Sequence, residues 1–287
     1  MRLRIGSGDM SIFFTKTSIG YSHVLSGRKC QDFSANYSDE ERTIVTACDG
    51  HGSDVYFRSH LGAKFASNAV IDVLREVERT AFYKNKKEAV IEKLKLNILC
   101  RWNALVDEHL LKNPFRYTDI IELTESEVLS LRKNPIKAYG TTLNAAMVLG
   151  TKLICVSIGD GGCFLVKNGE VVQAFAEDED EPVANITYSL CQDDAFSHLK
   201  VTVNELSNYD GAVVCTDGML NPYQSLTNFS YSLVAPAMMN LYQGKATALS
   251  EFVRDVGLKL GTGDDVSLGI VMKDKISQRN YTNKGIL

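Results

Sequence analysis

Three apolar stretches of this chain each run into an aspartate followed by glycine: Cys48–Asp49–Gly50, Gly159–Asp160–Gly161 and Thr216–Asp217–Gly218. A fourth acidic site, Asp264–Asp265, directly precedes another apolar run. If these strand ends meet at one edge of a β-sandwich, several carboxylates converge there with no Arg or Lys fixed among them. Such a cluster ionises at acceptable cost only when cations neutralise it. The pattern therefore favours a site for hard divalent ions.

The residue types narrow the chemistry further. Aspartate ligands without Cys or paired His favour Mg²⁺ or Mn²⁺ over zinc. Two such ions bridged by one carboxylate are a known arrangement for in-line attack on phosphorus. His51 lies between Gly50 and Gly52, titrates near neutral pH and could donate a proton. For any one stretch an ordinary Asp-Gly turn is the commoner interpretation, and the repetition favours a site.

The elements that must position these residues are mainly antiparallel strands. Consecutive β-type runs at 143–150, 152–158, 163–167 and 170–175 are separated by very short connections, which only antiparallel pairing allows. Further strands are expected at 11–19, 33–37, 44–48, 201–206, 212–215 and 266–272. The first two of these are expected to form a hairpin that turns at Gly27.

Apolar periodicity predicts the helices. Helices are expected at 54–77, 87–111, 231–241 and 246–260, and a short one within 123–131. The short helix has Thr124 and Glu127 as a capping box. In the second, the single tryptophan, Trp102, is expected in the core rather than at a ligand site. The helices are expected to cover the sheet and to carry none of the chemistry.

Composition describes an ordinary globular protein of 287 residues, 45% hydrophobic and 23% charged, with a net charge of −4. We expect a single domain over 1–287, with a flap around 175–200 and a frayed tail at 274–287. Seven cysteines without a C-x-x-C pair indicate a reducing, cytoplasmic location. No signal peptide and no run of about 18 apolar residues is evident, and no basic block favours nucleic acid or a membrane as partner.

Taken together, five ordered motifs resemble the metal-dependent Ser/Thr protein phosphatases, the protein phosphatase 2C family. The resemblance spans roughly residues 15–272, and the variant Ser22–His23…Cys30–Gln31–Asp32 is similar to a bacterial branch of that family. The motifs that carry it are Gln31–Asp32, Asp49–Gly50–His51–Gly52, Gly140–Thr141–Thr142, Thr216–Asp217–Gly218 and Gly263–Asp264–Asp265–Val266–Ser267.

The resemblance implies an α+β fold, a four-layer α-β-β-α sandwich of two mainly antiparallel sheets flanked by helices. It implies that Asp49 bridges two Mn²⁺ or Mg²⁺ ions and that the Gly50 carbonyl helps hold one. Asp217 and Asp264 would bind the other ion, and Asp32 would orient the attacking water from nearby. His51 would protonate the leaving serine or threonine oxygen.

Three positions depart from the family pattern. Gly27 stands where the family often has a phosphate-gripping Arg, so Arg28 or His23 is expected in that role. Asp160 lies in Gly-Asp-Gly rather than Gly-Asp-Ser, which favours a structural turn residue over a ligand. Asn221 stands where the family carries an acid for a third metal, and Lys137 precedes Gly140, so two ions are expected.

Three functions are compatible with these residues. The favoured one is hydrolysis of phosphoserine and phosphothreonine on proteins, with a role in signalling. The second is a non-catalytic module of the same fold that binds phosphoproteins, which the joint presence of Asp49, Asp217 and Asp264 argues against. The third is an unrelated two-metal hydrolase such as a nuclease, which the lack of a basic groove signature disfavours.

Overall fold

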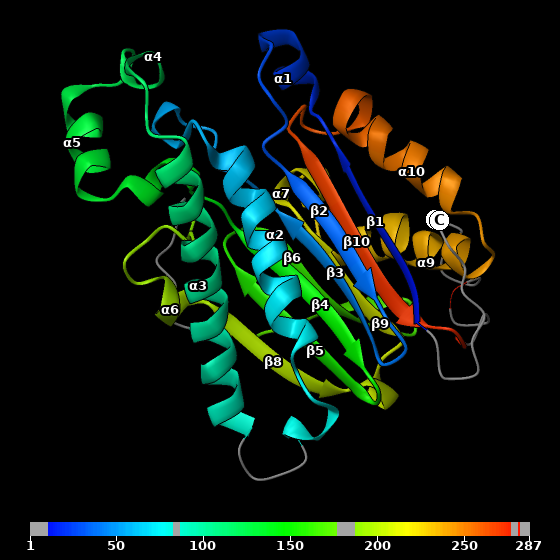
Figure 1. Cartoon of the computed structure of the whole chain (residues 1–287). Helices are drawn as coiled ribbons and strands as arrows, with labels where there is room; N and C mark the ends of the chain where they lie inside the picture. Colours follow the sequence, from blue (N-terminus) through cyan, green and yellow to red (C-terminus); the bar gives the residue numbers. More distant parts are fainter. Residues whose placement is uncertain (1–10, 83–86, 177–186, 277–280, 282–287) are drawn as a thin grey trace.

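The computed structural model describes residues 11–82, 87–176, 187–276 and 281 (Figure 1). Two five-stranded sheets lie face to face, and helices cover the outer face of each. The strands are β1 Ser11–Ser18, β2 Phe33–Ser38, β3 Arg42–Cys48, β4 Leu143–Leu149, β5 Lys152–Ile158, β6 Gly162–Lys167, β7 Glu170–Gln173, β8 Lys200–Glu205, β9 Gly211–Cys215 and β10 Val266–Lys273. The four-layer α-β-β-α sandwich expected from the sequence is confirmed.

Every strand pair within the two sheets is antiparallel. One sheet has the order β1-β10-β9-β6-β7 and the other the order β2-β3-β4-β5-β8. The β6–β7 hairpin turns at Asn168 and Gly169, whose φ angles of 54° and 79° suit a tight primed turn. The short connections therefore produce antiparallel neighbours for β4–β5 and for β6–β7. The expectation is wrong for the short connection between β5 and β6, because those two strands lie in different sheets and do not pair.

The predicted hairpin of the two amino-terminal strands is wrong. β1 pairs with β10, while β2 pairs with β3 in the opposite sheet. The segment between them contains a helix, α1 (Tyr21–Ser26), which ends at Gly27 in a left-handed conformation. Gly27 therefore terminates a helix. Glycine is common both in hairpin turns and at helix ends, so its presence alone did not distinguish the two.

The interior between the sheets is built of small apolar side chains. Val45, Ala146, Val148, Ala212 and Val214 are among its buried members, and they come from both sheets. Larger side chains, among them Leu153 and Leu165, complete this layer and pack the two sheets face to face. The strand ends beyond this layer are thereby brought together at one end of the sandwich.

Helices α2 (Ser59–Arg75) and α3 (Lys87–Lys112) cover the sheet that contains β3 and β4 (Figure 1). Trp102 is fully buried between them, and its indole nitrogen donates to the Gly62 carbonyl at 3.2 Å. The expected core position of Trp102 is confirmed. The helix expected over 54–77 is divided, since residues 54–56 form a 3₁₀ turn before α2 begins.

Helices α9 (Ala235–Tyr242) and α10 (Ala246–Asp255) cover the other sheet (Figure 1). The remaining helices are short: α4 Tyr117–Ile120, α5 Glu125–Lys133, α6 Ala195–His198, α7 Asp217–Leu220 and α8 Leu226–Phe229. The capping box of α5 is present, with the Thr124 hydroxyl accepting from the Glu127 backbone N–H at 3.3 Å. No helix in the described ranges is long and apolar enough to cross a bilayer.

Parts of the expected flap and tail, 177–186, 277–280 and 282–287, lie outside the described residues. Of the flap, the described part includes α6. In the tail, Tyr281 is buried and its hydroxyl donates to Asp210 Oδ2 at 2.8 Å.

Candidate metal centre

The strand register brings the predicted acidic residues to one end of the sandwich. Phe33 of β2 is paired with Cys48 of β3, so Asp32 and Asp49 are neighbours across that pair. Cys215 of β9 is paired with Leu268 of β10, so Asp217 and Asp264 both lie just beyond that end of the other sheet. The convergence expected from the Asp-Gly pattern therefore occurs across both sheets.

Asp32 is a buried carboxylate with one oxygen satisfied and one orphaned. The Thr216 hydroxyl donates to Asp32 Oδ2 at 2.8 Å and accepts from the Ser267 backbone N–H at 2.9 Å. Asp32 Oδ1 is buried without a hydrogen-bond partner among the described residues. Burial and the nearby charge of Asp265 raise the pKa of Asp32 well above its ordinary value, against the Thr216 hydrogen bond. An oxygen of this kind suits a cation or a bound water.

Asp49 is held through its backbone by the Thr141–Thr142 segment. Its N–H donates to the Thr142 hydroxyl at 3.0 Å, and its carbonyl accepts from the Thr141 hydroxyl at 2.7 Å. These two contacts fix the backbone of Asp49 at the end of β3. Burial, followed by the charges of Asp32, Asp217 and Asp264, raises the pKa of Asp49 well above its ordinary value.

Gly50 is in a position where a side chain would collide with backbone. An added Cβ would lie 2.7 Å from the Ser59 carbonyl carbon and 2.8 Å from the Gln31 carbonyl oxygen. The Gly50 N–H donates to that Gln31 oxygen at 3.1 Å. This close packing holds the chain after Asp49 against the start of α2, and with it the predicted ligand carbonyl of Gly50.

His51 is fixed by its backbone and by an aromatic neighbour. Its N–H donates to the Gly140 carbonyl at 3.1 Å, and its ring lies edge-on to Tyr56 with centroids 4.8 Å apart. A Cβ on Gly140 would lie 2.6 Å from Tyr56 and 2.8 Å from the His51 ring, so only glycine fits. Burial lowers the pKa of His51, and the charge of Asp160 opposes that shift.

Asp217 begins α7, and Asn221 lies one turn later on the same face. The Asn221 side-chain amide donates to Asp217 Oδ2 at 3.1 Å. Burial raises the pKa of Asp217, and the charges of Asp160 and Asp264 raise it further. Asp264 itself is exposed, and one of its oxygens accepts from the Asp265 backbone N–H at 2.8 Å.

Asp160, interpreted from the sequence as a turn residue, lies close enough to the cluster for its charge to act on both Asp217 and His51. Its carboxylate also accepts a hydrogen bond from the Thr187 hydroxyl. The signal for its position was present in the sequence, because Asp160 is the third of the Asp-Gly strand ends.

The two alternatives for phosphate binding lie in different surroundings. His23 Nδ1 is 2.8 Å from Asp265 Oδ2, and only 12% of the His23 side chain is exposed. Arg28 is half exposed, donates to the Gly52 carbonyl at 3.3 Å and lies 3.5 Å from Asp54. Arg28 is therefore the more accessible of the two, beside the loop that carries His51, while both roles stay predictions.

Asp265 is a buried residue whose part in the site the sequence left undefined. Its Oδ1 accepts from the Gly20 N–H at 2.7 Å, and its Oδ2 accepts from the Gln31 N–H at 2.6 Å. Together with the contact to His23, these hydrogen bonds tie two chain segments, the start of α1 and Gln31, to the start of β10. Asp265 thereby fixes Gln31, the residue before Asp32, against the residue that follows Asp264.

The ligand atoms of the candidate site are of the type that hard divalent ions prefer. Every group named for the cluster offers oxygen, and Asp32 Oδ1 is an unsatisfied buried acceptor. Where the structure describes the chain, no three His, Cys, Asp or Glu side chains converge closely enough to hold one ion as they stand. The carboxylates are near enough to repel, since the charges of neighbouring aspartates raise the pKa values of Asp49 and Asp217.

Comparison with solved structures supports the fold. A bacterial serine phosphatase superposes with a TM-score of 0.57 at 15% identity, covering 94% of this chain and 100% of that one. The catalytic domain of the serine/threonine phosphatase PstP, crystallised with two manganese ions, gives 0.54 at 17%, covering 92% and 99%. Stp1 from Staphylococcus aureus gives 0.53 at 13%, covering 95% and 98%.

A search of curated protein sequences found no match to this chain. The family model described as protein phosphatase 2C matches residues 19–254. That match includes Asp32, Asp49, His51 and Asp217 and covers most of the described fold. The chain belongs to the protein phosphatase 2C family.

Proposed function

We propose that this protein hydrolyses phosphoserine and phosphothreonine on proteins with the help of two Mn²⁺ or Mg²⁺ ions. The observation that carries the proposal is the meeting of Asp32, Asp49, Asp217 and Asp264 at one end of the sandwich, beside His51. An all-oxygen donor set of high negative charge is suited to hard divalent ions.

In this proposal each residue has a distinct task. Asp49 would lie between the two ions, the Gly50 carbonyl would help hold one, and Asp217 with Asp264 would hold the other. Asp32, fixed by Thr216, would orient the attacking water. When bound, the ions supply the positive charge that acidifies water and neutralises the phosphoryl group. His51 would pass its proton to the Oγ of the departing serine or threonine.

The test of this function compares two substrates in the His51→Ala variant. The serine oxygen released from phosphoserine is a poor leaving group and needs a proton, whereas nitrophenolate leaves without one. Turnover of a phosphoserine peptide should therefore fall about 10²-fold, the usual size of general-acid catalysis, while p-nitrophenyl phosphate hydrolysis falls less. Equal losses on both substrates would assign His51 a structural role instead.

The same assay separates an enzyme from a non-catalytic phosphoprotein-binding module. An enzyme releases inorganic phosphate in a Mn²⁺-dependent reaction that EDTA stops and that added Mn²⁺ restores. Binding of the phosphopeptide without release, at any Mn²⁺ or Mg²⁺ concentration, would refute the proposed hydrolysis and favour the module.

A further inference from the structure

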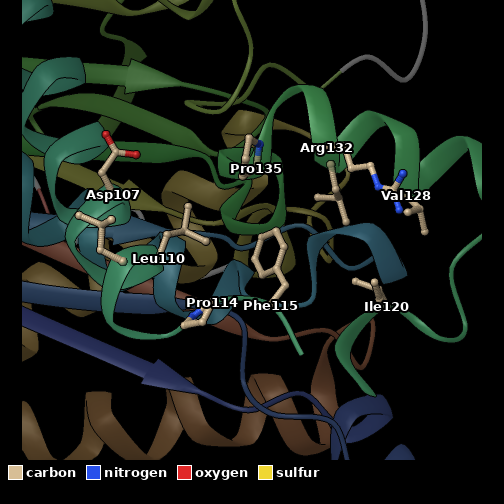
Figure 2. A pocket seen from close by; sticks show the side chains of 10 residues that line it. Asp107, Leu110, Pro114, Phe115, Ile120, Val128, Arg132 and Pro135 are labelled. Carbon is tan, nitrogen blue, oxygen red and sulfur yellow. The ribbon is translucent and has the colours of Figure 1, made fainter. Parts of the chain in front are cut away.

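An apolar groove lies between the C-terminal end of α3 and the short helices α4 and α5. Its volume is about 580 Å³, within the range of cavities that bind ligands. Leu110, Phe115, Ile120, Val128 and Leu131 provide most of its wall. In Figure 2 the Phe115 ring lies near the centre of the groove, with Ile120 and Val128 to one side and Leu110 to the other.

The chain segments that form the groove also carry several exposed apolar side chains. Leu111, which also lines it, is 86% exposed, and Tyr117 at the start of α4 is 73% exposed. Ile121 and Leu129 on the same two-helix segment are 57% and 48% exposed. Exposed apolar side chains on the segments that form an apolar groove favour an interaction site, because each costs free energy while it faces water.

The groove is held open by a buried cation. Arg58 donates to the Asn113 carbonyl at 2.6 Å and to the Tyr139 hydroxyl at 2.8 Å, and its guanidinium lies 3.4 Å from Asp119. The same guanidinium is 4.7 Å from the centre of the Phe115 ring. Since these contacts fix both the loop before α4 and the central ring, the groove is formed before anything binds in it. Binding of a partner therefore requires little loss of conformational freedom in the groove itself.

Two opposite charges stand at opposite sides of the groove. Figure 2 shows Asp107 on one side and Arg132 on the other. Among the described residues the side chain of neither has an ion pair or a hydrogen bond, whereas the nearby Glu108–Lys112 and Arg116–Asp119 side chains are paired. The groove thus combines an apolar floor with one negative and one positive side chain at its rim, and neither of these side chains has an ion-pair partner among the described residues.

We propose that this groove docks an amphipathic helix of a partner protein, with a basic residue facing Asp107 and an acidic residue facing Arg132. Helix-in-groove binding places apolar residues at i, i+3, i+4 and i+7 in the floor, and rim charges then select register and direction. A lipid chain or a small apolar molecule would contact the apolar residues of the groove but would form no ion pair with Asp107 or Arg132. Docking does not depend on the proposed phosphatase activity, so an experiment can refute either proposal without refuting the other.

The probe is a fluorescein-labelled synthetic helix of about 15 residues, with leucines on one face, a Lys at one end and a Glu at the other. Fluorescence polarisation should show saturable binding to the full-length protein. Arg132→Glu should weaken binding at least ~10-fold, since it puts two like charges together. A second probe with Lys in place of the Glu, and so a basic residue at both ends, should recover binding to that variant. Leu111→Lys should also weaken it, and Leu260→Lys, at an exposed position on another part of the surface, is the matched control.

The variants should keep wild-type melting temperatures and p-nitrophenyl phosphate turnover, because none touches the metal centre. Binding that is indifferent to Arg132→Glu, or no binding of the probe at all, would overturn the proposal. A concentration-dependent dimer that Leu111→Lys dissociates would also overturn it, because the occupant would then be a second copy of this chain.

Discussion

The imidazole of His51 lies edge-on against the phenol ring of Tyr56, with centroids 4.8 Å apart and planes at 64°. Both rings close over Gly140, which leaves no room for a side chain beneath them. This contact restricts the directions in which the His51 ring can point. Tyr56 is therefore a positioning residue for the proposed proton donor.

Loss of the Tyr56 ring should slow only the step that needs an aligned proton donor. Edge-to-face aromatic contacts are worth about 0.5–1.5 kcal/mol, so Tyr56→Ala should lower kcat on a phosphoserine peptide roughly 2- to 10-fold. Turnover of p-nitrophenyl phosphate should fall less, and Tyr56→Phe should restore both. If Tyr56→Phe is as slow as Tyr56→Ala, the hydroxyl rather than the ring is what matters.

Asp49→Asn should separate activity from stability. Removing the proposed bridging charge should lower phosphatase turnover at least ~10²-fold and weaken Mn²⁺ binding measured by calorimetry. The pKa of Asp49 is raised in the folded protein, so its contribution to stability is present at low pH and lost as pH rises above its ordinary value of 3.8.

Metal-free Asp49→Asn should consequently melt at a higher temperature than the parent at neutral pH, with the gain shrinking toward about pH 4. Ser53→Ala, on the same loop but outside the carboxylate cluster, is the control for a general effect of substitution there. Near-normal turnover in Asp49→Asn would eliminate the two-metal assignment.

Asn221→Asp should create a stronger third cation site. The Asn221 amide already lies 3.1 Å from Asp217 Oδ2, so the substitution puts a second carboxylate beside the first. Without metal the paired charges should lower the melting temperature, and with Mn²⁺ the bound stoichiometry should rise by up to one ion. Anomalous scattering from Mn²⁺-soaked crystals of both proteins would count the ions. A fully occupied third ion in the unmodified protein would contradict the prediction.

His60 should make the folded protein sensitive to mild acid. Burial, together with the positive charges of Lys29, His109 and Arg58, lowers the pKa of His60 from 6.5 to about 4. The unfolded chain takes up this proton first as pH falls, so the stabilising effect is complete above 6.5 and is lost as pH falls toward 4. Urea unfolding at a series of pH values should show this slope in the parent and a flatter one in His60→Gln. Lys29→Gln should flatten it partially, and identical slopes in all three proteins would contradict the prediction.

The fold was predictable to the extent that it follows local rules. Alternation, Asn168–Gly169 and short connections identified the β4–β5 and β6–β7 hairpins, and the Thr124–Glu127 capping box identified α5. They did not show that the chain passes from one sheet to the other between β5 and β6. Pairing between distant strands was not predictable in this way. β1 follows the same alternation whether its neighbour is β2 or β10, and only the tertiary structure selects β10.

The candidate site was predictable in its residue types but not in its supports. Asp-Gly at a strand end indicated Asp49 and Asp217, because strand ends of a sandwich gather at common edges. Nothing local indicated that Tyr56 meets His51 or that the Asp265 side chain turns back to Gly20 and Gln31. Those contacts depend on how separate elements pack, which a one-dimensional pattern does not record.

The contacts of Asp265 also set the order in which the site can come into being during synthesis. Its carboxylate accepts hydrogen bonds from Gly20 and Gln31, residues 245 and 234 positions earlier in the chain. A ribosome therefore releases Asp32, Asp49 and His51 long before the residue that anchors their surroundings has been translated. A nascent chain or an early-terminated fragment holds these residues without their anchor, so the candidate site can take its shape only after β10 has joined the sheet.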